Sequence, residues 1–194
     1  MDLQKIAVKF FTEAPDRPPL THFIEVFHGW IQASDGIYHD VADYSHMHAG
    51  PGIVLVAADA NLSIDESENR RGLLFCQKKL LSGSNYEKWV AVLRAALENC
   101  RRLEQEKSLT PPIRFLGNEV LVMINDRLEA PNREHVFKDT QAEIEAVARR
   151  LFGGAPVAFK RDGQARKRFN VTITTAQKFD IGALLKNLRT NDGA

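Results

Sequence analysis

The chain has 194 residues, of which 44% are hydrophobic and 26% charged, and its 26 basic and 25 acidic residues leave a net charge of +1. This composition is typical of an ordinary globular protein that needs no disulfide bonds to hold a sizeable core. The balance of charge argues against a protein that binds nucleic acid over its whole surface, and it leaves room only for a local basic patch.

Two features of the sequence predict a cytoplasmic protein. Cys76 and Cys100 lie far apart and form no CxxC pair, so we expect two reduced and mostly buried thiols. The first residues, "MDLQKIAVKFF", lack the pattern of a secretory signal. No window approaches the roughly 18 apolar residues that a membrane-spanning helix needs.

The first half of the chain alternates strand and helix patterns. Four segments have the apolar pattern of strands: 5–11, 52–59, a short stretch within 60–72, and 73–81. Apolar residues at spacings of three and four predict an amphipathic helix over Phe23–Ile31. The strongest helical pattern runs from Ser84 to Lys107, where Ser84 or Asn85 can serve as the N-cap.

The second half begins after "SLTPP" at 108–112, which is the best candidate for a hinge. Residues 113–126 predict a hairpin that turns at Gly117-Asn118, and Thr140–Phe152 predicts a helix. Residues 156–175 predict a second hairpin around Asp162-Gly163. A last short amphipathic helix follows.

These elements predict an α+β protein whose mostly antiparallel sheet has its helices packed on one side. We treat residues 1–194 as a single domain. A boundary at the hinge would instead give segments 1–108 and 112–194, and on element order alone these could be two ferredoxin-like halves.

Two blocks, "DVADYSHMHAGPGIVLVAADANLSID" at 40–65 and "NDRLEAPN" at 125–132, resemble a family of uncharacterised bacterial proteins. The resemblance covers most of the chain, but it implies no activity, ligand or catalytic residue. The sequence also lacks the glycine-rich nucleotide loops, the GxSxG elbow, the HExxH motif and the zinc-ribbon cysteines.

The histidine segment at 38–52 is the only cluster with the composition of a metal site. If residues 44–48 are extended, Tyr44, His46 and His48 share one face, and two imidazoles there begin a zinc or iron site. A third ligand would come from one of three neighbours: His39, Asp40 or Asp43. The favoured interpretation is structural, with both aspartates bonded to backbone amides in a turn. We therefore expect no metal and no other cofactor.

The segment "NDRL" is the second candidate site, because ligand-binding groups often lie where a core strand runs out into a loop. Asp126 and Arg127, with Asn125 and Asn132 nearby, could bind a carboxylate or a phosphate. In the favoured interpretation Asn125 and Asp126 cap a turn and Arg127 forms a structural salt bridge.

The hairpin at 159–169 is the third candidate, since basic and aromatic residues on a sheet can grip single-stranded RNA. Its residues are Phe159, Lys160, Arg161, Arg166, Lys167, Arg168 and Phe169. Alternation instead places both phenylalanines in the core, which favours a solvated charged hairpin. Trp30 and Trp89 lie on helix stripes, so we expect them in the core as well.

We therefore predict a module that binds a small ligand or associates with itself as a homodimer, without a recognisable catalytic motif. A metal-dependent enzyme centred on His39, His46 and His48 is the alternative, and an RNA-binding module that uses the basic hairpin is a weaker one. The candidate ligand-binding residues are Tyr44, His46, His48, Asn125, Asp126 and Arg127.

Overall fold

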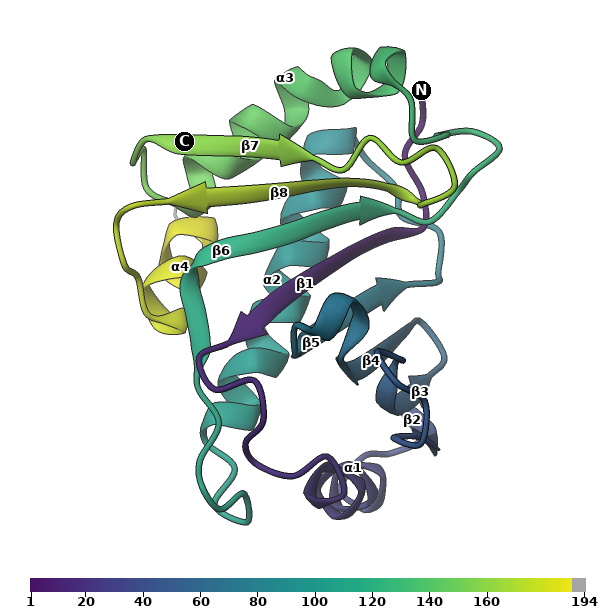
Figure 1. Cartoon of the computed structure of the whole chain (residues 1–194), viewed down its shortest axis with the longest axis vertical. Coiled ribbons are helices and arrows are strands. Elements are labelled where there is room, and N and C mark those ends of the chain that lie inside the picture. The colour runs from purple at the N-terminus through teal and green to yellow at the C-terminus, as the bar shows by residue number, and fades with distance from the viewer. Residues whose placement is uncertain (190–194) are drawn as a thin grey trace.

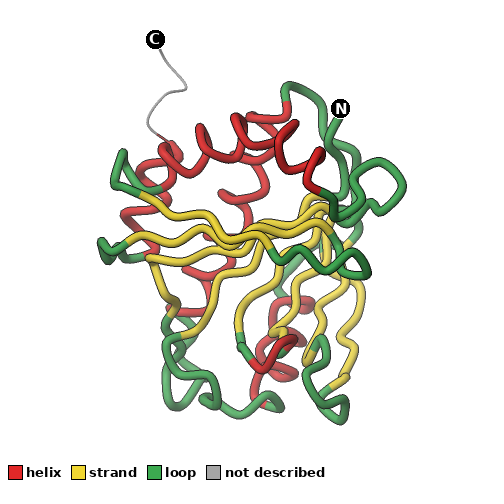
Figure 2. Tube along the Cα trace, turned by 45° about the horizontal axis from the view of Figure 1, so that its top comes forward, coloured by secondary structure: helices red, strands yellow, loops and turns green. Residues whose placement is uncertain are grey.

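In the computed structural model, which describes residues 1–189, eight strands form one sheet and every neighbouring pair is antiparallel (Figure 1). The strands are β1 (Ile6–Thr12), β2 (Tyr38–Tyr44), β3 (Gly52–Ala57), β4 (Ala60–Asp65), β5 (Gly72–Gln77), β6 (Phe115–Ile124), β7 (Val157–Arg161) and β8 (Phe169–Thr175). Their order in the sheet is β2-β3-β4-β5-β1-β6-β8-β7. Figure 2 shows the strong twist of this sheet, as expected of antiparallel strands.

Four α-helices pack against the sheet: α1 (His22–Gln32), α2 (Asn85–Glu104), α3 (Glu134–Leu151) and α4 (Ile181–Arg189). Helix α1 lies against β2 and β3, α2 against β1 and β5, and α4 against β6, while α3 packs on α2 and α4. No helix among residues 1–189 is long and apolar enough to cross a membrane.

The helices cover one face of the sheet, as the sequence predicts. Residues that face each other across neighbouring strands lie on the same side, and one such row runs across six strands. The row consists of Leu55, Leu62, Phe75, Val8, Val122 and Val171. All six belong to one apolar core together with the buried residues of all four helices. The expected α+β architecture is therefore confirmed.

Helix α2 is the central helix of this core, and its ends follow from the sequence. The Ser84 hydroxyl accepts a bond from the Glu87 backbone N–H, and the Glu87 carboxylate accepts one from the Ser84 N–H. This capping box satisfies two amides that have no partner inside the helix. Trp89, Leu93 and Leu97 are buried as predicted.

The predicted hairpin at Gly117-Asn118 is wrong, because β6 runs through both residues as one strand. Its pairing with β1 instead shifts between Phe10 and Thr12, so the extra residues form a bulge. The glycine is needed for another reason: a Cβ at Gly117 would lie 1.7 Å from the Phe179 carbonyl oxygen. The loop before α4 therefore packs directly on the β6 backbone.

Two further elements differ from the prediction. Residues 38–44 of the histidine segment form the edge strand β2, although their exposed polar residues hide the alternation. Helix α3 begins at Glu134, six residues before the predicted start. Thr140, the predicted first residue, lies inside the helix, where its buried hydroxyl donates to the Val136 carbonyl at 2.8 Å.

The segments on either side of 108–112 contribute to the same sheet. Strand β1 pairs with both β5 and β6, so the first strand of the chain joins the strands of the second segment. The second segment has the order β-α-β-β-α, one strand fewer than the predicted hairpin gives.

Candidate functional site: a charged groove on the open face of the sheet

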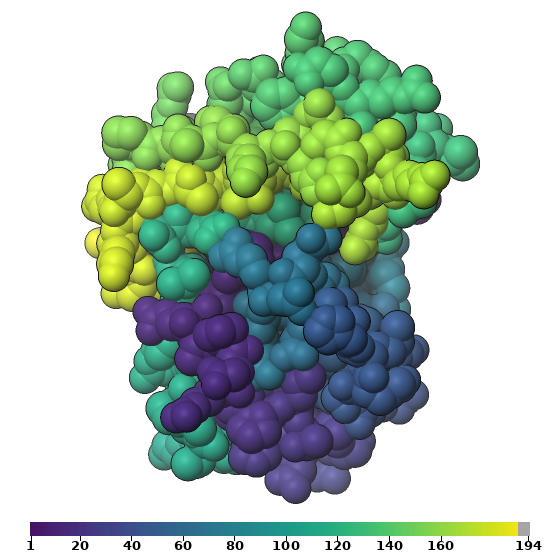
Figure 3. Space-filling view, in the orientation of Figure 1, coloured from purple at the N-terminus to yellow at the C-terminus, as the bar shows by residue number. Residues whose placement is uncertain are grey.

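The face of the sheet opposite the helices carries a groove of about 520 Å³. Strands β5, β1, β6 and β8 form its floor. The short 3-10 helix η1 (Ser67–Asn69) and the β7–β8 loop (162–168) stand on opposite sides of it (Figure 3). The lining contains seven basic side chains and four carboxylates, a local excess of positive charge greater than that of the entire chain.

The floor has a small apolar cluster of its own. Ala7, Leu74 and Met123 are buried on this face, and Cys76 and Leu121 pack beside them. Alternation along each strand sends every second side chain to this face, where no helix covers it. The long charged side chains that line the groove stand around this cluster instead.

The most deeply buried charges of the groove are Lys9 and Asp65, with exposed fractions of 2% and 3%. The Lys9 ammonium forms an ion pair with the Asp65 carboxylate and donates to the Ser67 carbonyl at 3.4 Å. The same carboxylate accepts the backbone N–H and the hydroxyl of Ser67 at 3.1 and 2.8 Å. Burial lowers the pKa of Lys9, and the Asp65 charge opposes that shift. The pair thus fixes the start of η1 to the floor.

Arg70 forms a second fixed pair at the groove. Its guanidinium binds both carboxylate oxygens of Glu119 at 2.7 and 2.8 Å and lies 3.7 Å above the Phe11 ring. The bonds to Glu119 raise the pKa of Arg70. Two-point binding and stacking hold this arginine in one orientation.

Lys167 joins the two sides of the groove. Its ammonium lies 2.8 Å from an Asp162 oxygen in its own loop and 2.8 Å from a Glu68 oxygen in η1. Both bonds raise the pKa of Lys167, and the bond to Asp162 contributes more than the bond to Glu68. The bond to Lys167 in turn lowers the pKa of Asp162.

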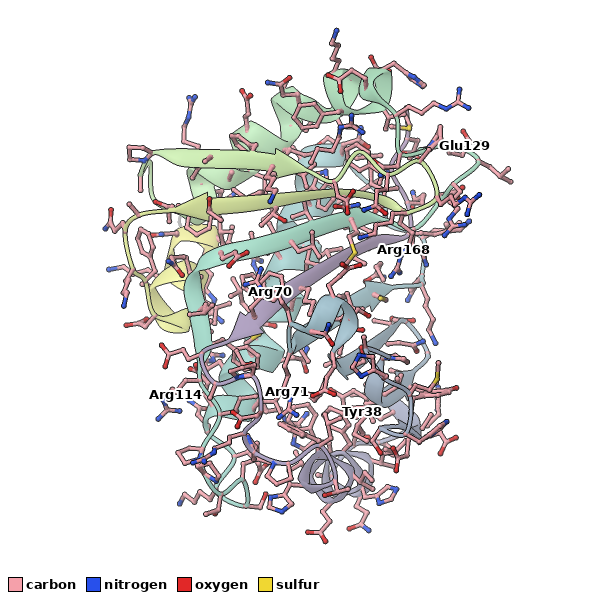
Figure 4. All side chains as sticks on the ribbon, in the orientation of Figure 1. Tyr38, Arg70, Arg71, Arg114, Glu129 and Arg168 are labelled. Carbon is pink, nitrogen blue, oxygen red and sulfur yellow. The ribbon has the colours of Figure 1, made fainter. Side chains whose placement is uncertain are left out.

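The remaining basic side chains of the groove form no ion pair within residues 1–189. Arg127, Lys160, Arg166 and Arg168 make no side-chain hydrogen bond or ion pair with any residue from 1 to 189, whereas all four lining carboxylates are paired. Figure 4 shows Arg70 and Arg168 on the side of the sheet away from α2. Four cations thus border a groove whose acids are already neutralised.

The "NDRL" segment contributes to this groove through Arg127 alone. Asp126 accepts the backbone N–H groups of Leu128 and Glu129, as the capping interpretation predicts, and pairs with Lys5 at 2.7 Å. The expected structural salt bridge of Arg127 is wrong, because this exposed side chain has no such partner among the described residues. Asn125 is exposed and does not line the groove.

Asn132 positions the hairpin that carries most of the unpaired cations. Its buried amide donates to the carbonyls of Asp162 and Gln164 at 2.6 and 2.9 Å, and its oxygen accepts a bond from Arg161 at 3.3 Å. Phe169 is buried and Phe159 half-buried against the helix-side core, which confirms the prediction for both rings.

The histidine segment lies away from the groove. Strand β2 ends at Tyr44, and the Met47 N–H donates to the Tyr44 carbonyl at 2.9 Å, so residues 45–49 form a turn. The shared strand face on which the metal hypothesis depends is therefore not formed, because His46 and His48 lie in that turn. The Tyr44 and His46 rings lie 6.5 Å apart, and His39 is exposed on the edge strand.

The aspartates of this segment bond to backbone amides, as predicted. Asp40 accepts the Val41 N–H and Asp43 the Ser45 N–H, both at 2.8 Å. The bonds to Ser45 lower the pKa of Asp43. Within residues 1–189, no three histidine, cysteine, aspartate or glutamate side chains are grouped so that they could hold a metal ion.

Sequence reasoning missed the η1 side of the groove. The stretch "DESENRR" predicts only a polar turn, yet it supplies Asp65, Glu68 and Arg70. Its one available signal was the high density of charge directly after a buried strand. The partners of these residues lie 49 to 99 positions away in the sequence, so the pattern could not reveal them.

Comparison with known proteins adds no relative. A scan against protein-family models found no match, and searches of curated proteins and of solved structures found none either. The resemblance of the two sequence blocks to an uncharacterised bacterial family therefore stays a prediction.

Proposed function

We propose that the protein binds a small anionic ligand in the groove on the open face of its sheet. One observation carries the proposal: Arg127, Lys160, Arg166 and Arg168 border the groove and form no ion pair or side-chain hydrogen bond within residues 1–189. Guanidinium groups bind carboxylates and phosphates at two points, and several of them converging on one recess favour a ligand with these groups.

The floor suggests that the ligand also has an apolar part. Leu74, Leu121 and Met123 lie beneath the charged rim, and polar Asn170 and Thr172 stand beside them. Small-molecule sites combine apolar surface with polar groups that fix the orientation of the ligand, and this groove has an apolar floor below a rim that is more charged than usual. Phosphate esters and carboxylates with a hydrocarbon body fit this combination.

The arrangement favours a small anion over single-stranded RNA. RNA-binding sheets stack bases on exposed aromatic rings. Here Phe159 and Phe169 belong to the helix-side core, and Arg70 already covers the Phe11 ring. The basic hairpin therefore offers charge without a stacking surface.

Calorimetric titration at low ionic strength tests the proposal, with pyrophosphate and phenyl phosphate as test ligands. We expect the wild type to bind at least one of them with a Kd below about 1 mM. Replacing Arg166 and Arg168 with alanine should weaken binding tenfold or more, because each charge-assisted bond contributes about 1.5–3 kcal/mol. If the affinity stays unchanged after both replacements, the proposed site is wrong. If neither ligand binds to the wild type, the proposed function is wrong.

A matched control separates the site from general electrostatics. Arg133 is the exposed N-cap residue of α3, does not line the groove, and makes no side-chain bond within residues 1–189. Arg133→Ala removes the same charge as each groove variant and should leave the affinity unchanged.

Three expectations from the sequence stand beside this proposal. Self-association as a homodimer is tested by light scattering after gel filtration. A cytoplasmic location is supported by Cys76 and Cys100, which are both free thiols. The metal-dependent alternative is tested by elemental analysis of protein purified without chelator. It would be established by about one metal ion per chain that is lost when His46 and His48 are replaced with alanine.

A further inference from the structure

Glu68 differs from the other three carboxylates of the groove. Asp65 is buried against Lys9, Glu119 binds Arg70 at two points, and Asp162 pairs with Lys167 inside one loop. The Glu68 side chain is 69% exposed, and it reaches Lys167 from a segment 99 residues away in the sequence. It is therefore the only lining carboxylate that is held by a single bond from the opposite side of the groove.

The backbone that presents Glu68 is unusual as well. Glu68 has φ = 61° and Asn69 has φ = 55°, so two consecutive residues other than glycine adopt the left-handed conformation. Such residues are uncommon, and they tend to occur where a side chain must be held in one place for function. The partly buried bonds between Asp65 and Ser67 fix the chain just before this point.

We infer, on the basis of the proposed function, that Glu68 occupies the place of a ligand anion on Lys167, and that the natural ligand carries two or more negative charges. An anionic group of phosphate or carboxylate type displaces the Glu68 carboxylate, binds Lys167 in its stead and separates η1 from the β7–β8 loop. Lys167 keeps its bond to Asp162 throughout, so it stays in position to receive the ligand.

The ion pair that Glu68 gives up is weaker than the set of bonds that a ligand anion can form in its place. An ion pair with a mostly exposed carboxylate contributes little to stability, because water screens it. A ligand anion that reaches Lys167 also comes within range of Arg166 and Arg168, which have no partner to give up among the described residues. A singly charged ligand can satisfy only part of this set. The expected preference is therefore for multiply charged anions.

The test measures pyrophosphate and acetate binding to the wild type, Glu68→Gln, Lys167→Met and the double variant. Removing the competing carboxylate should tighten pyrophosphate binding by about three- to fivefold, the full effect of an exposed ion pair. Lys167→Met should weaken it, and in that background Glu68→Gln should have no further effect. Acetate should bind far more weakly than pyrophosphate in every case.

Glu129→Gln is the control, because Glu129 is exposed in the loop beside Arg127 but does not line the groove (Figure 4). An equal gain in Glu129→Gln, or a gain from Glu68→Gln that persists without Lys167, would overturn the inference. Such a gain would reflect general electrostatics. Loss of all anion binding in the wild type would instead overturn the proposed function, so the two failures are distinguishable.

Discussion

The two faces of the sheet bury their side chains by different means. On the helix face, rows of aliphatic and aromatic residues pack against four helices. On the open face, the same strands present Ala7, Leu74 and Met123, which are buried although no α-helix among residues 1–189 packs over them. Charged side chains line the groove above them, and side chains rearrange more easily than packed helices. The helix face therefore stabilises the fold, and the open face is the one that can exchange its cover for a ligand.

The largest effect is expected at the one place where the open face resembles a core. Lys9→Met leaves Asp65 buried without its cation, so the free energy of unfolding should fall by about 3–5 kcal/mol. Urea denaturation measures this directly.

The double variant Lys9→Met, Asp65→Leu is the control for that experiment. Because it removes both charges, it should recover most of the lost stability. A single variant that costs less than about 1 kcal/mol would mean that water reaches Asp65, and that the open face is not packed as described.

Two neighbouring residues of β8 compare the faces directly. Ile173 is buried among the helix-side residues and Thr172 lines the groove. Ile173→Ala should lower the free energy of unfolding by about 2–5 kcal/mol, and Thr172→Ala should change it by about 0.5 kcal/mol or less. Similar losses at both positions in urea denaturation would show that the open face contributes to the core to the same extent.

The helix face could be predicted from the sequence because its signals are periodic. The apolar stripe of α2 and the apolar run of β1 each lie within one segment. The open face depends on pairs such as Glu68 with Lys167, which only the strand order brings together. Nothing in the sequence indicates that Lys9 is buried on that face. The edge strand β2 was missed because its exposed polar residues carry no period.

The helix face can also be weakened without a change in the sheet. Ser84→Ala removes the side-chain half of the α2 capping box and should cost about 1 kcal/mol, within the usual range of 0.5–2 kcal/mol. Ser84→Thr, which keeps a hydroxyl, is the matched control and should cost less. Equal losses from the two replacements in urea denaturation would mean that the hydroxyl bond to Glu87 does not stabilise the helix.

The smallest effect concerns the two thiols, which report on the two faces without a change in stability. Cys100 is fully buried in α2, and burial raises its pKa well above the ordinary value. Cys76 is half-buried on the open face, and burial raises its pKa to about 11, while Arg168 opposes the shift. Only the thiolate reacts with iodoacetamide, so at pH 8 Cys76 should react about a hundredfold more slowly than an unperturbed thiol.

Intact-mass measurements over time follow the alkylation of the two thiols. Cys76→Ala is the control, because Cys100 is then the one thiol that remains. Below pH 11, the alkylation rate of Cys76 should increase about tenfold for each unit by which the pH is raised, because the thiolate fraction increases by the same factor. Arg168→Ala should slow it further, since removal of the nearby cation raises the pKa. Cys100 should react only when the protein unfolds. If Cys100 reacts first in folded protein, the helix face is the looser one; if Cys76 reacts like a free thiol, charged side chains do not cover the open face.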